Sequence, residues 1–196
     1  VRTYSASRDG GGRISVHYIQ SLSKAVRSRL LFNGSQTTEL DYRSMHLFLL
    51  YRRAGVVLDY SQFPNGDPYD IGGEYSLDRS DIKECFTAVL GEGSEQSFLS
   101  HTAYRDRTNA GFSERDRRRA LKCLREAHPV IERFFFKRIS RELQKEESDI
   151  ALMVLQRLMA LDIPVIPVHE SFIVKRKHQS QLRHIMLERL PKAVIT

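Results

Sequence analysis

The sequence has little of several features that would point to particular classes of protein. Its 196 residues include only two cysteines, Cys85 and Cys123, which lie far apart and form no CxxC pair. This spacing argues against a disulfide framework or a structural zinc site and favours a reducing compartment. No apolar run is long enough to cross a bilayer, and no signal-peptide pattern is visible. We therefore expect a cytoplasmic protein that makes no contact with a membrane.

The chain also lacks internal repeats and long low-complexity linkers. Its length suits one domain, or one domain with a small subdomain. Val1 and the polar stretch 5–12 resemble a processed or truncated beginning. What the sequence does have is positive charge, with a formal net charge of +7. A basic surface favours phosphate-rich ligands such as nucleic acids.

The first half of the chain contains signals for one strand and two helices. Asn33-Gly34 predicts a turn, and the segment after it reads as a short strand that ends at Leu40-Asp41-Tyr42. Ser44 is typical of a helix N-cap, and Gly55 of the end of the same helix. A loop over about 60–75 precedes a second predicted helix over about 78–90.

The second half predicts four more helical segments and a hairpin. Ser113 and Asp116 resemble a capping box, and Pro129 suits the first turn of a helix. Two β-rich runs, 163–168 and 172–174, flank a polar tip, as in a β-hairpin. The remaining helices are predicted at about 113–128, from 129, at about 147–160 and at about 179–190. We therefore predict an α/β fold of the α+β type, with a small sheet covered by several helices.

Two acidic residues, Asp41 and Glu170, stand at the ends of predicted apolar strands. Phosphoryl transfer with two divalent ions needs such carboxylates close together, because hard cations such as Mg²⁺ prefer oxygen ligands. Taken alone, an acid in the position of Asp41 is more often a turn or cap residue, and one in the position of Glu170 is more often a solvated residue of a hairpin tip. The sequence does not show whether the two strands are neighbours.

With their flanks, these segments resemble the motifs of family A DNA polymerases, above all the short, divergent members from bacteriophages and mobile elements. The order agrees across roughly two-thirds of the chain, and the matching segments are Glu39–Leu47, Asp67-Pro68-Tyr69, Arg79-x-x-x-Lys83 with Val89-Leu90-Gly91, Gln144 with Ser148-Asp149-Ile150, and Pro167–Ser171. The resemblance implies an antiparallel polymerase palm over about 13–66 and 129–196. It also implies a reduced helical fingers region over about 67–128, in a bacterial or phage-infected cell.

The resemblance also implies roles for individual residues. Asp41 and Glu170 would bind two Mg²⁺ or Mn²⁺ ions, and the backbone after Asp41, at Tyr42, would approach the triphosphate. Arg79 and Lys83, four residues apart on one helix face, would hold the incoming phosphates, and Lys83 would also take part in catalysis. The alternative for this pair is a solvated helix face.

Two histidines complete the implied site. His169 would lie near the primer terminus, and His46 stands where DNA-synthesising members place a Glu that excludes the ribose 2′-hydroxyl. An RNA-synthesising relative is therefore one alternative. Glu170 replaces the family's Asp, and Thr87 and Gly91 replace aromatic residues that pack on the nucleotide. A second alternative is therefore an inactive palm that binds nucleic acid as a replication-accessory module.

A basic run on the predicted helix 113–128 is the last functional candidate. Its residues predict a contact with a phosphate backbone, salt-sensitive and independent of base sequence, or else an exposed helix face. We expect the partners to be a DNA primer–template, nucleoside triphosphates and other replication proteins. The basic residues are Arg115, Arg117, Arg118, Arg119, Lys122 and Arg125.

Overall fold

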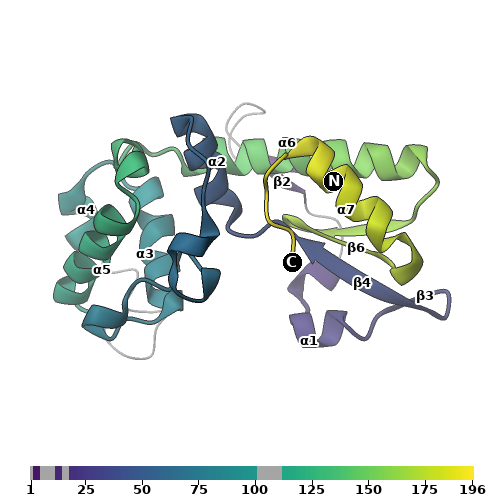
Figure 1. The fold of residues 1–196 in the computed structure, drawn as a ribbon, viewed down its shortest axis with the longest axis horizontal. Coiled ribbons are helices and arrows are strands. Elements are labelled where there is room, and N and C mark those ends of the chain that lie inside the picture. Colours follow the sequence, from purple (N-terminus) through teal and green to yellow (C-terminus); the bar gives the residue numbers. More distant parts are fainter. Residues whose placement is uncertain (1, 5–11, 15–17, 101–111) are drawn as a thin grey trace. The chain divides into compact units, whose positions relative to one another are not determined.

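The chain forms two compact units, shown in the computed structural model of Figure 1. The sheet unit consists of Val1–Phe48 and Arg141–Thr196, and the helical unit consists of Leu49–Ser140. Along the sequence, helices α2 (Met45–Ala54) and α6 (Ser140–Ala160) each pass from one unit into the other. The residues that the structure describes are 2–4, 12–14, 18–100 and 112–196.

The sheet unit is built on a four-stranded antiparallel sheet with the strand order β3-β4-β6-β5. A separate two-stranded ribbon joins β1 (Arg2–Tyr4) to β2 (Gly12–Ile14). With the helices, this small antiparallel sheet confirms the predicted α+β fold. The strands of the main sheet are β3 (Leu31–Phe32), β4 (Ser35–Asp41), β5 (Val165–Val168) and β6 (Ser171–Lys175).

Two tight hairpins set the register of this sheet. Asn33 and Gly34 join β3 to β4 with φ angles of 48° and 74°, the left-handed conformation that matches the twist of a two-residue hairpin. His169 and Glu170 join β5 to β6, and His169 also has a positive φ, of 54°. The sequence predicted both turns.

One face of the sheet is apolar and forms the core of the sheet unit. Leu40 pairs with Phe172 across β4 and β6, and both side chains are buried. Helix α7 (Gln179–Arg189) packs against these strands, and the hydroxyl of Tyr42 donates a hydrogen bond of 2.8 Å to the carbonyl of Met186 in that helix. In Figure 1, α6 and α7 lie on one side of the strands.

The opposite face is polar where β4 and β6 meet. Because side chains alternate along a strand, Glu39 and Asp41 share this face with Ser171 and Ile173 of the paired strand. The short helix α1 (Lys24–Arg27) contributes Arg27 to it. The predicted acid Asp41 therefore lies on the face away from the Tyr42 side chain.

The helical unit contains the helices α3 (Arg79–Gly91), α4 (Glu95–Ser100) and α5 (Glu114–Ala127). Capping boxes begin two of them, because Asp78 and Asp81 exchange hydrogen bonds at α3, and Ser113 and Asp116 do so at α5. The predicted capping box at Ser113 is thus confirmed. Shorter 3₁₀ turns precede α3 at Tyr60–Gln62, Pro64–Gly66 and Gly73–Tyr75, and another follows α5 at Pro129–Phe134.

Two predicted features differ from the structure, and one helix of the structure was not predicted. Helix α6 begins at Ser140 and not near 147, because Leu143 anchors its polar first turns in the core. Ser44 precedes α2, but it has a φ of 51°, and its buried hydroxyl makes no capping bond to any described residue. Helix α4 was not predicted, because only six residues form it.

The boundary between the units also lies elsewhere than expected. The segment 49–66 belongs to the helical unit and not with the sheet. The reason is packing: Tyr51 contacts His128 at the end of α5, and the ring of Phe63 lies 5.1 Å from the same imidazole. Segment 129–140, expected with the sheet, is in the helical unit as well, since the backbone N–H of Phe136 bonds to the carbonyl of Val89.

His128 is the most buried titratable group of the helical unit, with no exposed surface. Its Nε2 lies 2.9 Å from the carbonyl oxygen of Pro68, and its Nδ1 lies 2.9 Å from the hydroxyl of Tyr51. A carbonyl can only accept, so Nε2 carries the proton, and the neutral ring accepts from Tyr51 at Nδ1. Burial lowers the pKa of His128 to about 4, although the bond to Pro68 opposes the shift.

We expect this histidine to make the protein acid-sensitive. The unfolded chain binds a proton at His128 below about pH 6.5, whereas the folded protein does so only near pH 4. The stability that neutral His128 contributes is therefore complete above pH 6.5 and is lost as the pH falls to 4, by roughly 3 kcal/mol in total. Urea unfolding between pH 7 and pH 4 measures this loss. A His128→Gln variant with the same pH slope as the wild type would contradict it.

Candidate functional site

The structure places the two predicted acids at adjoining points of the sheet. Asp41 is the last residue of β4 and pairs with Ser171, the first residue of β6. Glu170 precedes Ser171 in the hairpin turn, and its carbonyl oxygen lies 3.5 Å from the backbone N–H of Tyr42. Both acidic residues are partly exposed. The pairing of β4 with β6, which the sequence could not show, brings these two positions together.

The backbone of Asp41 is held from both sides. Besides its pairing with β6, its N–H and carbonyl bond to the carbonyl and N–H of Thr196, at 2.9 and 3.0 Å. The N–H of Arg43 bonds in the same way to Val194. A carboxylate that leaves a backbone fixed in this way is well placed to keep a constant position, as a catalytic or metal-binding group requires.

His169 is exposed at the tip of the hairpin, beside Glu170. Its positive φ is a conformation that residues with a side chain seldom adopt, and here the tight turn imposes it. The turn keeps His169 out of the core, next to the predicted metal ligand.

Tyr42 is the first of two corrections. Its side chain is 2% exposed, its ring packs edge-on against Phe172, and its hydroxyl is bonded to Met186. Burial raises the pKa of this phenol. Tyr42 is therefore part of the core, and its backbone N–H is directed at the carbonyl of Glu170, so the structure does not offer it as a substrate contact.

His46 lies on the first turn of α2 and contacts α6. Its Nε2 is 2.9 Å from Oε2 of Glu147, whose side chain is only 6% exposed. The contact is an ion pair whenever the imidazole is protonated. A buried carboxylate thus lies next to the position that the polymerase resemblance associates with sugar selection, although the residue at that position is a histidine.

A second carboxylate, Glu39, lies on the same sheet face as Asp41 and was not predicted to belong to the site. Its two oxygens accept hydrogen bonds of 2.8 and 3.0 Å from the guanidinium of Arg27. The hydroxyl of Ser171 also donates to it, at 2.8 Å. Burial raises the pKa of Glu39, but the bonds from Arg27 and Ser171 together lower it by more than burial raises it. The net shift of the pKa is therefore downward. The alternation of β4 could have indicated Glu39, but nothing in the sequence indicated its partners.

The predicted phosphate-binding pair lies in the helical unit. Arg79, Lys83 and Thr87 are all exposed and follow one another at four-residue intervals along α3. The guanidinium of Arg79 is bonded to the carboxylate of Asp67 and lies over the ring of Tyr69. The structure therefore joins two of the segments that carry the polymerase resemblance, and it leaves Lys83 facing solvent.

The basic residues of α5 require the second correction. Arg117 is 7% exposed, and its guanidinium donates to the carbonyls of Leu99 and Phe112 at 2.6 to 3.1 Å. The arginine was predicted to contact nucleic acid, but it holds the end of α4 against α5. Its position on the apolar side of the helix, between Ala120 and Ser113, is the signal that could have shown this.

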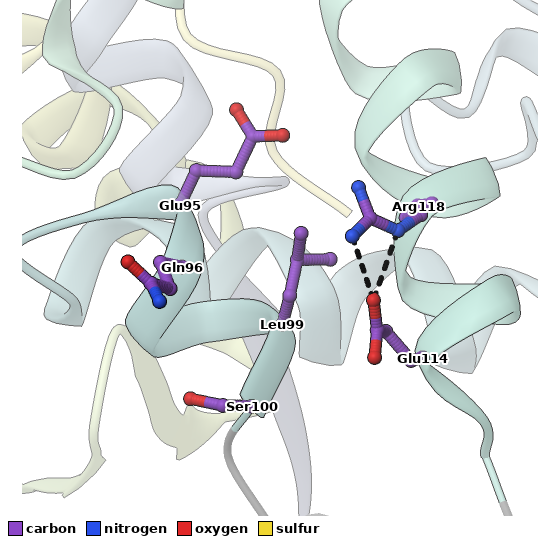
Figure 2. Close-up of a pocket in the computed structure, with 6 residues that line it drawn as sticks. All are labelled: Glu95, Gln96, Leu99, Ser100, Glu114 and Arg118. Atoms are coloured by element: carbon purple, nitrogen blue, oxygen red, sulfur yellow. Dashed lines mark hydrogen bonds and ion pairs between the residues drawn. The ribbon is translucent and has the colours of Figure 1, made fainter.

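The other basic residues of α5 lie at the surface, most of them beside acidic groups. Arg118 pairs with Glu114 one turn away, and Arg125 lies 2.9 Å from both Glu95 and Glu132. A shallow hollow between α4 and α5 includes the first of these pairs (Figure 2), and its lining consists of Glu95, Gln96, Leu99, Ser100, Glu114 and Arg118. Of the residues predicted for the site, the hollow therefore contains Arg118 alone.

Two of the remaining cations contact the side chain of Tyr75. Arg119 and Lys122 lie 5.5 and 5.4 Å from the centre of its ring, and the ammonium of Lys122 is 2.7 Å from its hydroxyl. Arg115 is exposed. Cations arranged around an aromatic ring are suited to single-stranded nucleic acid, which offers both phosphates and base faces.

The oxygen donors of Asp41 and Glu170 are of the type that a hard divalent cation prefers. In the described part of the chain, no three acidic, histidine or cysteine side chains gather into a metal site. Mg²⁺ is commonly held by only one or two carboxylates, with substrate phosphates and water as its other ligands. Asp41 and Glu170 supply those two carboxylates at adjoining positions.

No protein-family model matches this chain, and no curated protein matches it. None of the helices in the described ranges is long and apolar enough to cross a membrane. The candidate site therefore depends on the geometry given above.

The burial of Arg117 predicts a large effect on stability. Replacing it with alanine leaves two buried carbonyls without their charged donor, which costs about 2–4 kcal/mol. Arg118→Ala is the matched control, because that arginine is exposed and its pair with Glu114 contributes less than about 0.5 kcal/mol. Urea unfolding of both variants measures the difference. Equal stability of the two variants would contradict the structural role of Arg117.

Proposed function

We propose that the sheet unit is a polymerase-type palm and that the protein catalyses template-directed nucleotidyl transfer with two divalent metal ions. The observation that carries this proposal is the pairing of β4 with β6, which brings Asp41 beside the hairpin turn that contains Glu170. Two-metal phosphoryl transfer requires carboxylates close together, and this pairing supports the proposal because it brings the two residues to adjoining backbone positions.

In this proposal the chain acts mainly by holding and orienting groups. Asp41 and Glu170 would hold Mg²⁺ or Mn²⁺, and the metal would supply activation of the primer hydroxyl and neutralisation of charge on the phosphates. Arg79 and Lys83 bind the phosphates of the incoming nucleotide, Arg79 as a planar fork and Lys83 as a point charge. His169, exposed beside Glu170, faces the end of the primer.

The exposed cations of α5 supply the contact with nucleic acid. We assign it to Arg115, Arg119 and Lys122, with Tyr75 as a ring on which a base can stack, and with Arg118 and Arg125 at its margin. Because the contact is made largely with phosphates, its affinity falls steeply with salt and depends little on base sequence.

One alternative is an inactive palm that binds nucleic acid as an accessory module. It is favoured by Glu170, because a side chain one methylene longer than Asp displaces its carboxylate, and catalytic geometry tolerates little displacement. Such a module would bind DNA equally well without Asp41 and without Mg²⁺. A second alternative, synthesis of RNA, is favoured by His46, which stands where DNA-synthesising members of the family place a Glu, and it predicts a preference for ribonucleotides.

Primer extension tests the proposal directly. We expect the wild type to extend a labelled primer on a template with Mg²⁺ or Mn²⁺. Asp41→Asn and Glu170→Gln should each lower the rate at least about a hundredfold, because each removes a charge that stabilises the transition state. Reactions with ribo- and deoxyribonucleotides, run side by side, distinguish DNA from RNA synthesis.

Asp162→Asn is the control for loss of one acidic group. Asp162 is exposed in the loop before β5 and has a positive φ, which asparagine also tolerates. This variant should extend primers at the wild-type rate. A wild type that binds primer–template but never extends it, with the same DNA affinity as Asp41→Asn, would favour the accessory module over the enzyme.

A further inference from the structure

Three groups meet on the polar face of the sheet beside Asp41. Arg27 uses Nη2 and Nε to bind both oxygens of Glu39, and its Nη1 donates to the carbonyl of Leu22 at 2.6 Å. The Ser171 hydroxyl has one proton to donate and two acceptors within reach, a carboxylate oxygen of Glu39 at 2.8 Å and the carbonyl oxygen of Val168 at 3.0 Å. The side chains of Arg27 and Glu39 are only 13% and 12% exposed. Burial and these hydrogen bonds therefore hold the cluster in place.

The cluster is coupled electrostatically to the candidate metal ligand. The hydrogen bond to Glu39 is the main reason why the pKa of Arg27 is raised, and the negative charges of Glu39 and Asp41 both add to the shift. Arg27 therefore interacts with two carboxylates of one sheet face. Glu39 lies two residues before Asp41 on the same strand, so its charge, if unbalanced, would act on any cation held there.

We propose that Arg27 and Glu39 form a neutral pair that sets the affinity of the Asp41–Glu170 site for divalent metal, with Glu39 as a carboxylate kept away from the metal by Arg27. The inference rests on the proposed function, and Arg27 and Glu39 are positioning residues in it. The pair keeps a third negative charge from tightening the site, and it holds β4 and β6 in register through Ser171.

The proposal predicts effects of opposite sign for the two members of the pair. Arg27→Gln exposes the charge of Glu39 to the metal and should tighten Mn²⁺ binding by about tenfold. Glu39→Gln keeps the hydrogen-bond acceptors but leaves the charge of Arg27 unbalanced, so binding should weaken by about tenfold. The double variant restores neutrality and should return close to the wild-type affinity. A purely structural pair would instead weaken binding in both single variants.

The experiment is titration of the 196-residue chain with Mn²⁺ alone, followed by the electron paramagnetic resonance signal of the free ion. Arg27→Lys keeps the charge and loses the fork, so it should bind Mn²⁺ like the wild type and unlike Arg27→Gln. Glu188→Gln, an exposed acid of α7 paired only with His184 among the interactions seen, controls for loss of one charge at a distance. Thermal unfolding checks that each variant is folded.

The outcomes separate this inference from the proposed function. Wild-type binding of Mn²⁺ that is unaffected by Asp41→Asn would contradict the proposed function and the inference together. Binding that depends on Asp41, but weakens in both Arg27→Gln and Glu39→Gln, would overturn the inference alone. The inference would also fail if Arg27→Lys behaved like Arg27→Gln, because geometry and not charge would then explain the effect.

Discussion

The antiparallel pairing of β4 with β6 is the interaction on which the candidate site depends. It aligns Asp41 with Ser171, and it places Leu40 and Phe172 together on the buried face. A slip of one residue would exchange the two faces of a strand and move Asp41 into the core. The burial of Leu40 and Phe172 therefore stabilises the sheet and also fixes the position of Asp41.

Much of the local structure could be predicted because its causes are local. Asn33-Gly34 and the capping box at Ser113 act within a few residues, and the hairpin 163–174 has strong strand and turn signals. Pairings between distant segments could not be predicted. Ser171 and Glu39 are 132 positions apart in the sequence, and no pattern in either strand selects the other as its neighbour. The resemblance to family A polymerases, and not periodicity, gave the expectation that Asp41 and Glu170 lie together.

The candidate site shows the same division. Residue type and position at strand ends made Asp41 and Glu170 candidates. They could not show that Arg117 is buried, because an arginine in a basic run is expected at the surface until its helix face is known. Sequence also could not reveal that Glu39 is neutralised by Arg27, since that contact joins a four-residue helix to a strand. Charges near a metal site matter as much as its ligands, and their pairing requires a structure.

In the proposed function, Asp41 and Glu170 together bind divalent metal. The most direct measurement is anomalous diffraction from crystals soaked in Mn²⁺ with a nonhydrolysable nucleoside triphosphate analogue. We expect an anomalous peak within coordination distance, about 2–2.5 Å, of carboxylate oxygens of both residues. Manganese bound elsewhere, with neither carboxylate among its ligands, would contradict the proposed metal site.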